Sequence, residues 1–258
     1  MFEEYYAPLP DREAYLDRIG LGGETLPPTA ETLHRLIVAQ LTHVPFENLD
    51  VYERGLCPEL GVQALFDKIV TSRRGGYCFE LNGLFQKLLE SLGFSCYSVI
   101  VRIMRGNEAP YPAHRGIVAV LPEGKAYCDV GFGGPASLWP VPLGGEATPD
   151  GFRAETDGDS VYIRSPGEGA DARTLLFTDM PALPVDFLPM NIHMARGDGS
   201  YFRMKAMANL RTADGSVSID GDVLRIRSEG SLTERTLENR ADYYAALREN
   251  FGIDLPLR

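Results

Sequence analysis

The sequence predicts an α+β fold, because helical and strand patterns occupy different parts of the chain. Residues 11 to about 95 carry mainly helical periodicity, whereas residues 96 to about 190 carry short strands rich in β-branched residues. The chain has 258 residues, 44% of them hydrophobic, which is enough for a sizeable core. We expect three parts, residues 1–95, 96–190 and 191–258.

Three helices are expected in the first part. Residues 11–19 are amphipathic and end at Gly20, and a second helix follows Thr29, a residue type that suits a helix start. The third helix begins at Cys78 and should end near Gly93. Its apolar residues recur at helical spacing: Leu81, Leu84, Phe85, Leu88, Leu89 and Leu92.

A β-hairpin is expected in the middle part. Residues 116–121 and 125–130 form its strands, with a turn at residues 122–125. The span 131–160 is rich in Gly, Pro and Asp and is expected to be loop. The other expected elements are strands at residues 96–103, 160–163, 175–177 and 221–226 and a final helix at residues 241–251 that ends at Gly252.

Composition and charge exclude several classes of protein. The net charge of −11 repels nucleic acid, whose binding requires neutralised phosphates. No stretch approaches the roughly 18 apolar residues of a membrane span. The N-terminus, Met1-Phe-Glu-Glu-Tyr-Tyr, is acidic where a secretory signal would be basic and then apolar. We therefore expect a cytoplasmic protein with no nucleic-acid or membrane partner.

The chain contains four cysteines, Cys57, Cys78, Cys96 and Cys128. None belongs to a CxxC pair, so no zinc or other metal site is expected. Their number would also allow two disulfides, but nothing else in the sequence points to export. We interpret all four as free thiols.

Cys78 is the strongest candidate for covalent chemistry. It lies in Arg74-Gly-Gly-Tyr-Cys78-Phe-Glu-Leu-Asn82, at the first turn of the expected third helix. The two glycines allow a sharp turn before the helix. The helix dipole favours the thiolate, which is the nucleophilic form of cysteine. The alternative is that Cys78 is a small buried apolar residue, as cysteines usually are.

Two further residues complete a candidate triad. His114 lies 36 residues after Cys78, and Asp129 another 15 residues on. With the expected turn, residue 118 pairs with Asp129, so His114 and Asp129 share a face but lie four residues apart, roughly 13 Å at strand rise. A bulge, a curled strand or another turn length must close this gap. If they meet, Asp129 orients the imidazole and His114 acts as base for Cys78. Otherwise His114 is a core or loop histidine and Asp129 caps a turn.

The sequence resembles the arylamine N-acetyltransferase family over nearly its whole length. The matching segments follow the family's order with compatible spacing, so that together they are a strong signal although each is weak alone. They are Tyr15-Leu-Asp-Arg-Ile-Gly20, Val44-Pro-Phe-Glu-Asn-Leu-Asp50, Arg74-Gly-Gly-Tyr-Cys78-Phe-Glu80, Pro112-Ala-His114-Arg, Asp129-Val-Gly-Phe-Gly-Gly134 and Leu247-Arg-Glu-Asn-Phe-Gly252.

The resemblance implies a papain-like arrangement around a cysteine triad. A helical bundle over residues 1–95 would carry the nucleophile, a β-barrel over residues 96–190 the His and Asp, and residues 191–258 would form an α/β lid. It also implies ping-pong transfer of an acetyl group from acetyl-CoA to an aromatic amine or hydrazine through a cysteine thioester. Acetyl-CoA would be a co-substrate, and no cofactor would be tightly bound. The implied triad is Cys78, His114 and Asp129.

The resemblance further implies a set of residues around the substrates. Phe132 would line the acceptor pocket, and Glu47 and Arg74 would form a structural ion pair beside the nucleophile. The other expected binding residues are Phe46 of the Pro45-Phe46 pair, Gly133, Ser200 and Phe202.

Residues 191–202 depart from the family pattern, because Ala195-Arg196 stands where a Ser-Thr pair is usual. The same region holds a cluster of cations that we call the basic island: Arg196, Arg203, Lys205 and Arg211. The basic island is either a solvated surface or a binding site for an anion. The anion would be a coenzyme A phosphate or the acidic face of an acyl carrier protein.

If the basic island binds an acyl carrier protein, the chain would be a different kind of enzyme. Amide synthases of ansamycin-type pathways resemble this family and keep the triad, but they release a carrier-bound polyketide as a macrolactam. Two further alternatives are a relative that only binds ligand and a cysteine protease. The intact triad argues against the first, and the Cys/His/Asp order with its flanking motifs argues against the second.

Overall fold

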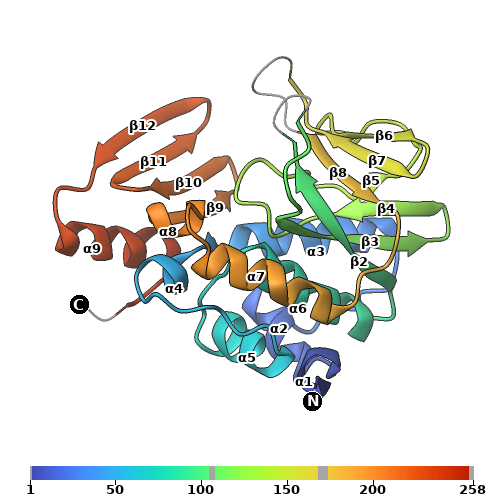
Figure 1. Cartoon of the computed structure of the whole chain (residues 1–258), viewed down its shortest axis with the longest axis horizontal. Helices are drawn as coiled ribbons and strands as arrows, with labels where there is room; N and C mark the ends of the chain where they lie inside the picture. The colour runs from blue at the N-terminus through green and yellow to red at the C-terminus, as the bar shows by residue number, and fades with distance from the viewer. Residues whose placement is uncertain (1, 105–107, 168–173, 256–258) are drawn as a thin grey trace.

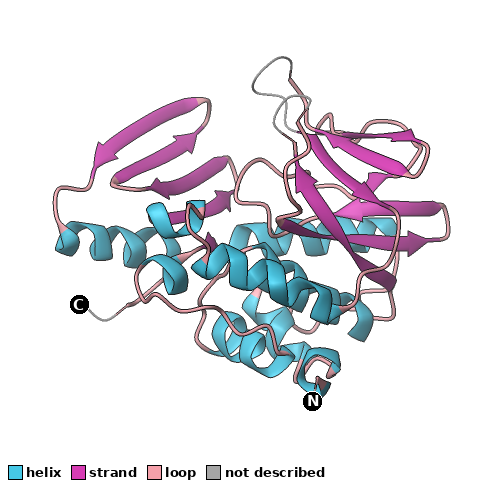
Figure 2. Cartoon of the chain, viewed as in Figure 1, coloured by secondary structure: helices cyan, strands magenta, loops and turns pink. Residues whose placement is uncertain are grey.

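The computed structural model describes residues 2–104, 108–167 and 174–255 and confirms the α+β class. Helices gather on one side of the molecule, and two antiparallel sheets, one of seven strands and one of five, lie on the other (Figure 1). Figure 2 shows the same separation by type of element. The described residues include no helix that is long and apolar enough to cross a membrane.

The helices that precede the first long strand end with α6. They are α1 (Glu3–Tyr6), α2 (Arg12–Arg18), α3 (Ala30–His43), α4 (Leu49–Tyr52), α5 (Val62–Phe66), a π-helical segment (Asp67–Thr71) and α6 (Cys78–Ser91). The side chains of Asp11 and Thr29 accept backbone N–H groups at the starts of α2 and α3, which confirms the predicted starts. Most of α6 is buried, because it packs between the other helices and the larger sheet.

The seven-stranded sheet forms the middle of the chain. Its strands are β2 (Ser95–Ile103), β3 (His114–Leu121), β4 (Gly124–Cys128), β5 (Val141–Pro142), β6 (Arg153–Asp157), β7 (Ser160–Arg164) and β8 (Thr174–Thr178), in the order β5-β4-β3-β2-β8-β7-β6. The edge strands β5 and β6 contact each other, so the sheet curls into a nearly closed barrel. One face of β3, with Ile117 and Ala119, packs on the helices, and the other, with Val118, faces the barrel interior.

The hairpin between β3 and β4 corrects the predicted turn. Leu121 pairs with Gly124, so the loop holds two residues instead of four. Continuing this register places Asp129 opposite Gly116. His114 and Asp129 are therefore two residues apart, and the predicted offset of four residues is wrong because the turn is tighter than expected.

The five-stranded sheet joins distant segments of the chain. Its strands, in spatial order, are β1 (Phe46–Glu47), β9 (Met207–Thr212), β10 (Gly215–Asp220), β11 (Val223–Ser228) and β12 (Ser231–Thr236). A 3₁₀ turn (Pro184–Asp186), α7 (Phe187–Arg196) and α8 (Tyr201–Met204) lead from the barrel to this sheet. The last helix, α9 (Arg240–Phe251), packs on it and ends at Gly252, whose φ of 65° is left-handed, as the sequence predicts.

Several elements differ from the sequence-based expectation. The span 131–160, predicted as loop, contains β5 and β6, which are short or exposed edge strands without an apolar pattern. The strands β10 and β12 and the helix α7 were also not expected, and β12 is exposed at every residue. The predicted division at residues 95 and 190 stays a prediction. It must accommodate β1, which crosses from the first part into the last sheet.

Candidate active site

Cys78 is held at the start of α6 by local contacts. It is the first residue of the helix and is 3% exposed. The Glu80 carboxylate accepts the Tyr77 backbone N–H at 3.1 Å, which satisfies a donor at the helix start. Gly75 is required before the helix, because a Cβ there would lie 1.9 Å from the Pro45 carbonyl oxygen. The position of the thiol is therefore fixed by its neighbours in sequence.

His114 and Asp129 meet across the β3–β4 hairpin. His114 Nε2 lies 2.5 Å from Asp129 Oδ2, and both side chains are buried. The two-residue offset makes them diagonal neighbours on one face of the sheet, within reach of each other's side chains. Asp129 also accepts hydrogen bonds from the Tyr127 hydroxyl at 2.8 Å, from Asn82 Nδ2 at 2.8 Å and from the Gly131 N–H at 2.9 Å. The carboxylate is thus held from four sides.

The buried His–Asp pair carries opposite charges. Burial alone would lower the pKa of His114, but the charges of Asp129 and Cys78, and hydrogen bonds to both, outweigh burial and raise it. Burial alone would raise the pKa of Asp129, but His114 and the hydrogen bonds from Asn82 and Gly131 lower it. An imidazolium beside a carboxylate is therefore the favoured state of the pair at neutral pH.

Cys78 completes the group on the other side of the imidazole. Burial and the charge of Asp129 have the largest effects on the pKa of His114. Cys78 raises this pKa further, through its charge and through a side-chain hydrogen bond. The Cys78 sulfur lies 3.8 Å from the carbonyl oxygen of Ala113. Because Nε2 faces Asp129, Nδ1 is the ring nitrogen that can exchange a proton with the sulfur. The three predicted residues are thus brought together around one imidazole ring.

The candidate triad opens into a cleft of about 740 Å³. Cys78 and His114 lie in its wall, and its volume is within the range of small-molecule sites. The lining is mostly apolar and comes from the barrel, from α7 and α8 and from the five-stranded sheet. It consists of Phe46, Cys78, Ile103, Met104, Pro110, Tyr111, Ala113, His114, Gly131, Phe132, Gly133, Gly134, Met194, Gly199, Tyr201, Phe202, Met207, Ala208, Asn209, Ser218, Ile219, Asp220 and Arg225.

Comparison with known proteins identifies the family. A family model described as N-acetyltransferase matches residues 29–258. An arylamine N-acetyltransferase of Mycolicibacterium smegmatis is 33% identical over 257 residues, covering 95% of this chain and 92% of the relative. The chain belongs to the arylamine N-acetyltransferase family.

Solved structures of arylamine N-acetyltransferases have the same fold. The enzyme from Salmonella typhimurium superposes with a TM-score of 0.85 at 26% identity, covering 96% of this chain and 92% of the other. The Mycobacterium marinum enzyme in complex with CoA superposes with a TM-score of 0.83 at 28% identity, covering 94% and 93%. The papain-like fold that the resemblance implies is therefore confirmed.

Half of the substrate-binding residues predicted from the sequence line the cleft. These are Phe46, Phe132, Gly133 and Phe202. The Phe132 ring lies edge-on to His114, with centroids 5.5 Å apart, and the Phe46 and Phe202 rings lie 6.2 Å apart. Gly133 permits this packing, because a Cβ there would lie 2.7 Å from the Phe46 ring.

The other half is absent from the lining that the described residues form: Arg196, Ser200, Arg203 and Lys205. Ser200 is buried and its hydroxyl donates to a backbone carbonyl of α7. Lys205 Nζ lies 2.5 Å from Asp220, and Arg203 lies 3.7 Å from Asp198. Parts of the basic island are thus paired with acids beside the cleft, and whether they bind an anion stays a prediction.

Two residues around Asp129 were not singled out from the sequence. Asn82 lies one helical turn after Cys78, and Tyr127 lies two residues before Asp129, so their spacings could have indicated them. Asn82 also donates to the Arg115 carbonyl at 2.5 Å, and its side-chain oxygen accepts the Val130 N–H at 2.9 Å. Asn82 therefore joins the nucleophile helix to both strands of the hairpin.

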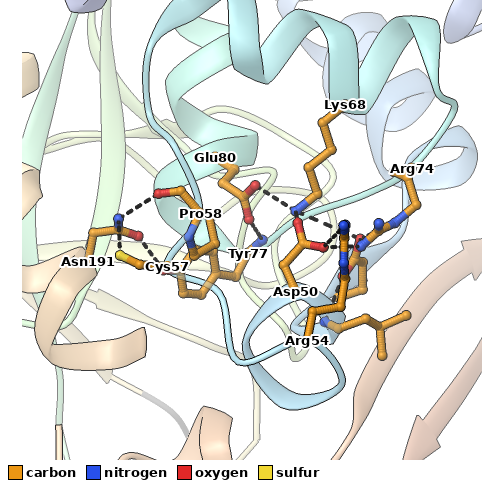
Figure 3. A network of polar contacts seen from close by, with 11 residues as sticks. Asp50, Arg54, Cys57, Pro58, Lys68, Arg74, Tyr77, Glu80 and Asn191 are labelled. Atoms are coloured by element: carbon orange, nitrogen blue, oxygen red, sulfur yellow. Dashed lines mark hydrogen bonds and ion pairs between the residues drawn. The ribbon is translucent and has the colours of Figure 1, made fainter. Parts of the chain in front are cut away.

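A network of charged side chains lies beside Tyr77 and Glu80 at the start of α6 (Figure 3). The predicted ion pair is confirmed, since Arg74 Nη2 lies 2.7 Å from Glu47. Lys68 Nζ lies 2.7 Å from both Asp50 and Glu80. Three carboxylates thus share two cations, of which Arg74 is buried and Lys68 is partly buried. Because the Glu80 carboxylate also accepts the Tyr77 backbone N–H, the network supports the start of α6.

Asn191 attaches α7 to the same region (Figure 3). Its Nδ2 donates to the Pro58 carbonyl at 2.9 Å and to the Cys57 sulfur at 3.2 Å, and its Oδ1 accepts the Tyr77 hydroxyl. The position of α7, which supplies Met194 to the cleft, is therefore tied to the residue before Cys78.

Metal ligands are not clustered in the described part of the chain. No group of three or more His, Cys, Asp or Glu side chains there could hold a metal ion. The four cysteines are free thiols.

Proposed function

We propose that the chain transfers an acetyl group from acetyl-CoA to an aromatic amine or hydrazine by a ping-pong mechanism. The observation that carries the proposal is the grouping of Cys78, His114 and Asp129, with Cys78 and His114 in the wall of a cleft. The relatives named arylamine N-acetyltransferase and the related structure in complex with CoA support the acceptor and donor classes.

The first half-reaction would acylate the enzyme. The Cys78 thiolate attacks the thioester carbonyl of acetyl-CoA, and the sulfur of coenzyme A leaves as a thiolate. His114, as imidazolium, gives its proton to that leaving sulfur, while Asp129 keeps the ring oriented. The products are acetyl-Cys78 and free coenzyme A, and His114 is left neutral.

The second half-reaction would transfer the acetyl group. The amine nitrogen attacks the carbonyl of acetyl-Cys78, and neutral His114 accepts the proton that the amine loses. The bond between sulfur and carbonyl carbon breaks, which returns the Cys78 thiolate and the His114 imidazolium. The released product is the N-acetylated amine.

Aromatic residues in the cleft support an aromatic acceptor. Phe46, Phe132 and Phe202 line the cleft, and Phe132 lies against the imidazole that would accept the amine proton. Ring packing against such side chains is favourable for a flat aromatic substrate.

Cytoplasmic localisation, with no nucleic-acid or membrane partner, forms part of this proposal.

Intact-mass spectrometry after brief incubation with acetyl-CoA tests the proposal. One acetyl adduct should form, map to Cys78 in peptide digests, and disappear when an arylamine is added. Cys78→Ser is the matched control, since a serine hydroxyl stays protonated beside the same base and should form no adduct on this timescale. A folded wild-type protein that shows no adduct at millimolar acetyl-CoA would contradict the proposal.

The second candidate is an amide synthase that releases a carrier-bound polyketide as a macrolactam. The observation that favours it is the size of the cleft, because an acetyl group fills little of about 740 Å³. The pantetheine arm of coenzyme A would also occupy that space, and the relatives named arylamine N-acetyltransferase support acetyl transfer as the first candidate. An amide synthase should ignore acetyl-CoA but become acylated by a small thioester mimic of the polyketide.

A further inference from the structure

Arg115 lies beside the nucleophile helix. It follows His114 directly in β3, and neighbouring side chains of a strand point to opposite faces of the sheet. His114 faces Asp129, whereas Arg115 lies between β3 and α6. Gly83 of α6 provides the space, because a Cβ there would lie 2.8 Å from Arg115 Nη1. The guanidinium therefore lies against the helix that begins with Cys78.

The guanidinium is buried among neutral groups. Arg115 is 4% exposed, its Nε donates to Ser98 Oγ at 2.8 Å, and its Nη2 lies 3.2 Å from Gln86 Oε1. Its central carbon lies 4.6 Å from the centroid of the Phe187 ring. Within residues 2–104, 108–167 and 174–255, no carboxylate forms an ion pair with it. A buried charge without an opposite partner is costly, so this cation needs another explanation.

Among the charged groups near Arg115, Cys78 has the largest effect on the pKa of its guanidinium. Gly83 lies five residues beyond Cys78, which is about 7.5 Å along the helix axis. Burial lowers the pKa of Arg115 to about 10, and the opposing charges are Cys78 first, then Glu90 and Cys96. The guanidinium therefore remains protonated at neutral pH, within electrostatic reach of the thiol.

The charged form of the triad has an excess negative charge, which a nearby cation would neutralise. A Cys78 thiolate, a His114 imidazolium and an Asp129 carboxylate together carry one net negative charge in a buried site. Arg115 brings the sum to zero. We propose that Arg115 is a positioning residue whose buried charge favours the thiolate of Cys78 before acylation. The inference rests on the proposed function in taking Cys78 as the nucleophile.

The pH dependence of Cys78 alkylation tests this role. Iodoacetamide labelling should be measured from acidic to alkaline pH in the wild type and in Arg115→Gln, Arg115→Met and Arg115→Lys. In the two neutral variants, labelling at neutral pH should be roughly tenfold slower and the profile should move to higher pH. Arg115→Lys should keep a profile close to the wild type, because it retains the charge. Methionine leaves no unsatisfied donor. If Arg115→Gln does not fold, Arg115→Met therefore still allows the alkylation profile of a neutral variant to be measured.

Arg18 provides a matched control. It is also buried, and it donates to the carbonyl oxygens of Ile69 at 3.1 Å and His43 at 2.5 Å, but Cys78 is not among the charges that act on it. Arg18→Gln should lower the thermal midpoint and leave the alkylation profile unchanged. A folded neutral variant of Arg115 that is labelled like the wild type, or an equal change in Arg18→Gln, would overturn the inference.

The two proposals fail in distinguishable ways. Alkylation requires neither donor nor acceptor, so it reports on Arg115 even if acetyl-CoA does not acylate the protein. A normal acetyl adduct on Cys78 in the wild type, together with unchanged alkylation in the Arg115 variants, would reject this inference alone.

Discussion

Each cysteine side chain has its own surroundings, and these predict which thiol reacts. Burial raises the pKa of Cys57 and Cys128, and it raises that of Cys96 to about 12. Cys78 instead meets an imidazolium at a helix start. Iodoacetamide should therefore alkylate Cys78 at least roughly tenfold faster than the other three, as measured by peptide mass spectrometry at short times. Equal labelling of all four thiols in the folded protein would contradict the assignment of the nucleophile.

Replacing the orienting acid should disable the imidazole. Asp129→Asn keeps the shape of the side chain but removes its charge, and the amide favours the wrong tautomer of His114. Acylation by acetyl-CoA should fall by roughly two orders of magnitude or more, and alkylation of Cys78 should also slow. Stopped incubations followed by intact-mass spectrometry give the rate. Near-normal acylation would mean that another group holds His114.

Tyr127 should make a smaller contribution than Asp129 to the acylation rate, because it acts through the Asp129 carboxylate. Its hydroxyl donates to the Asp129 oxygen that His114 also contacts, and Gly116 leaves space for its ring. Tyr127→Phe removes one of four hydrogen bonds to Asp129, so acylation should slow by roughly tenfold or less. Tyr97→Phe is the matched control, since Tyr97 donates to Asp179 away from the triad. If the two variants behave alike, Tyr127 has no special role.

Sequence patterns could predict the triad but not all of its surroundings. Cys78 and His114 lie in short segments whose residue types are characteristic by themselves, so each could be recognised locally. The partners of Arg115 come from α6, β2 and α7, and no local spacing connects them. That Arg115 is buried with no carboxylate partner among the described residues is visible only once these elements are packed together.

At the level of elements, the start of α6 depends on a carboxyl group with an unusual proton affinity. Burial raises the pKa of Glu80 from 4.5 to about 7, with Glu47 and Asp50 adding to the effect and Lys68 opposing it. The folded chain thus binds this proton more tightly than the unfolded chain. The stability that follows is present below about pH 4.5 and is lost as the pH rises through about 7.

We therefore expect Glu80→Gln, which cannot titrate, to differ from the wild type in its pH dependence. Between pH 5 and 8 the wild type should lose on the order of 2 kcal/mol of unfolding free energy relative to the variant. Urea denaturation at several pH values measures this difference. Glu90→Gln, which alters an exposed carboxylate on the same helix, should follow the wild type. Parallel curves for the wild type and Glu80→Gln would contradict the prediction.

Elements with a strong apolar pattern were predictable, and elements without one were not. The start of α6 and the end of α9 match the expected positions because capping residues and apolar spacing agree there. The predicted register of β3 against β4 was wrong. A tighter turn moves the pairing by two residues but leaves the alternation of apolar residues unchanged, so the sequence pattern could not reveal it. The exposed strand β12 has no buried face to reveal it.

At the level of the whole molecule, a net charge of −11 repels an anionic donor, so cations near the cleft should matter for its approach. Reversing Arg196, Arg203 and Lys205 to Glu should reduce acylation several-fold at low salt, by roughly tenfold or less. The loss should shrink as salt rises and should be offset by high acetyl-CoA.

Charge reversal elsewhere separates a local effect from a global one. Arg12, Arg153 and Arg235 are exposed cations outside the described cleft lining, and each lies beside an acid. Reversing these three to Glu changes the net charge equally. If both triple variants lose the same activity, the basic island is not a donor site. The sequence showed these cations as a cluster, but only the fold shows that Lys205 pairs with Asp220 at the end of β10.

The short strand β1 also sets the order in which the cleft can be built. Phe46 pairs with Asn209 of β9 and bridges to Gly76, just before the nucleophile. A ribosome makes Phe46 and Gly76 early and Asn209 late, and segments that emerge first begin to fold first. A nascent chain therefore carries the Cys78 helix before the sheet that walls the cleft exists. During synthesis, the Cys78 thiol therefore lacks the wall that β9 and β10 provide in the folded protein.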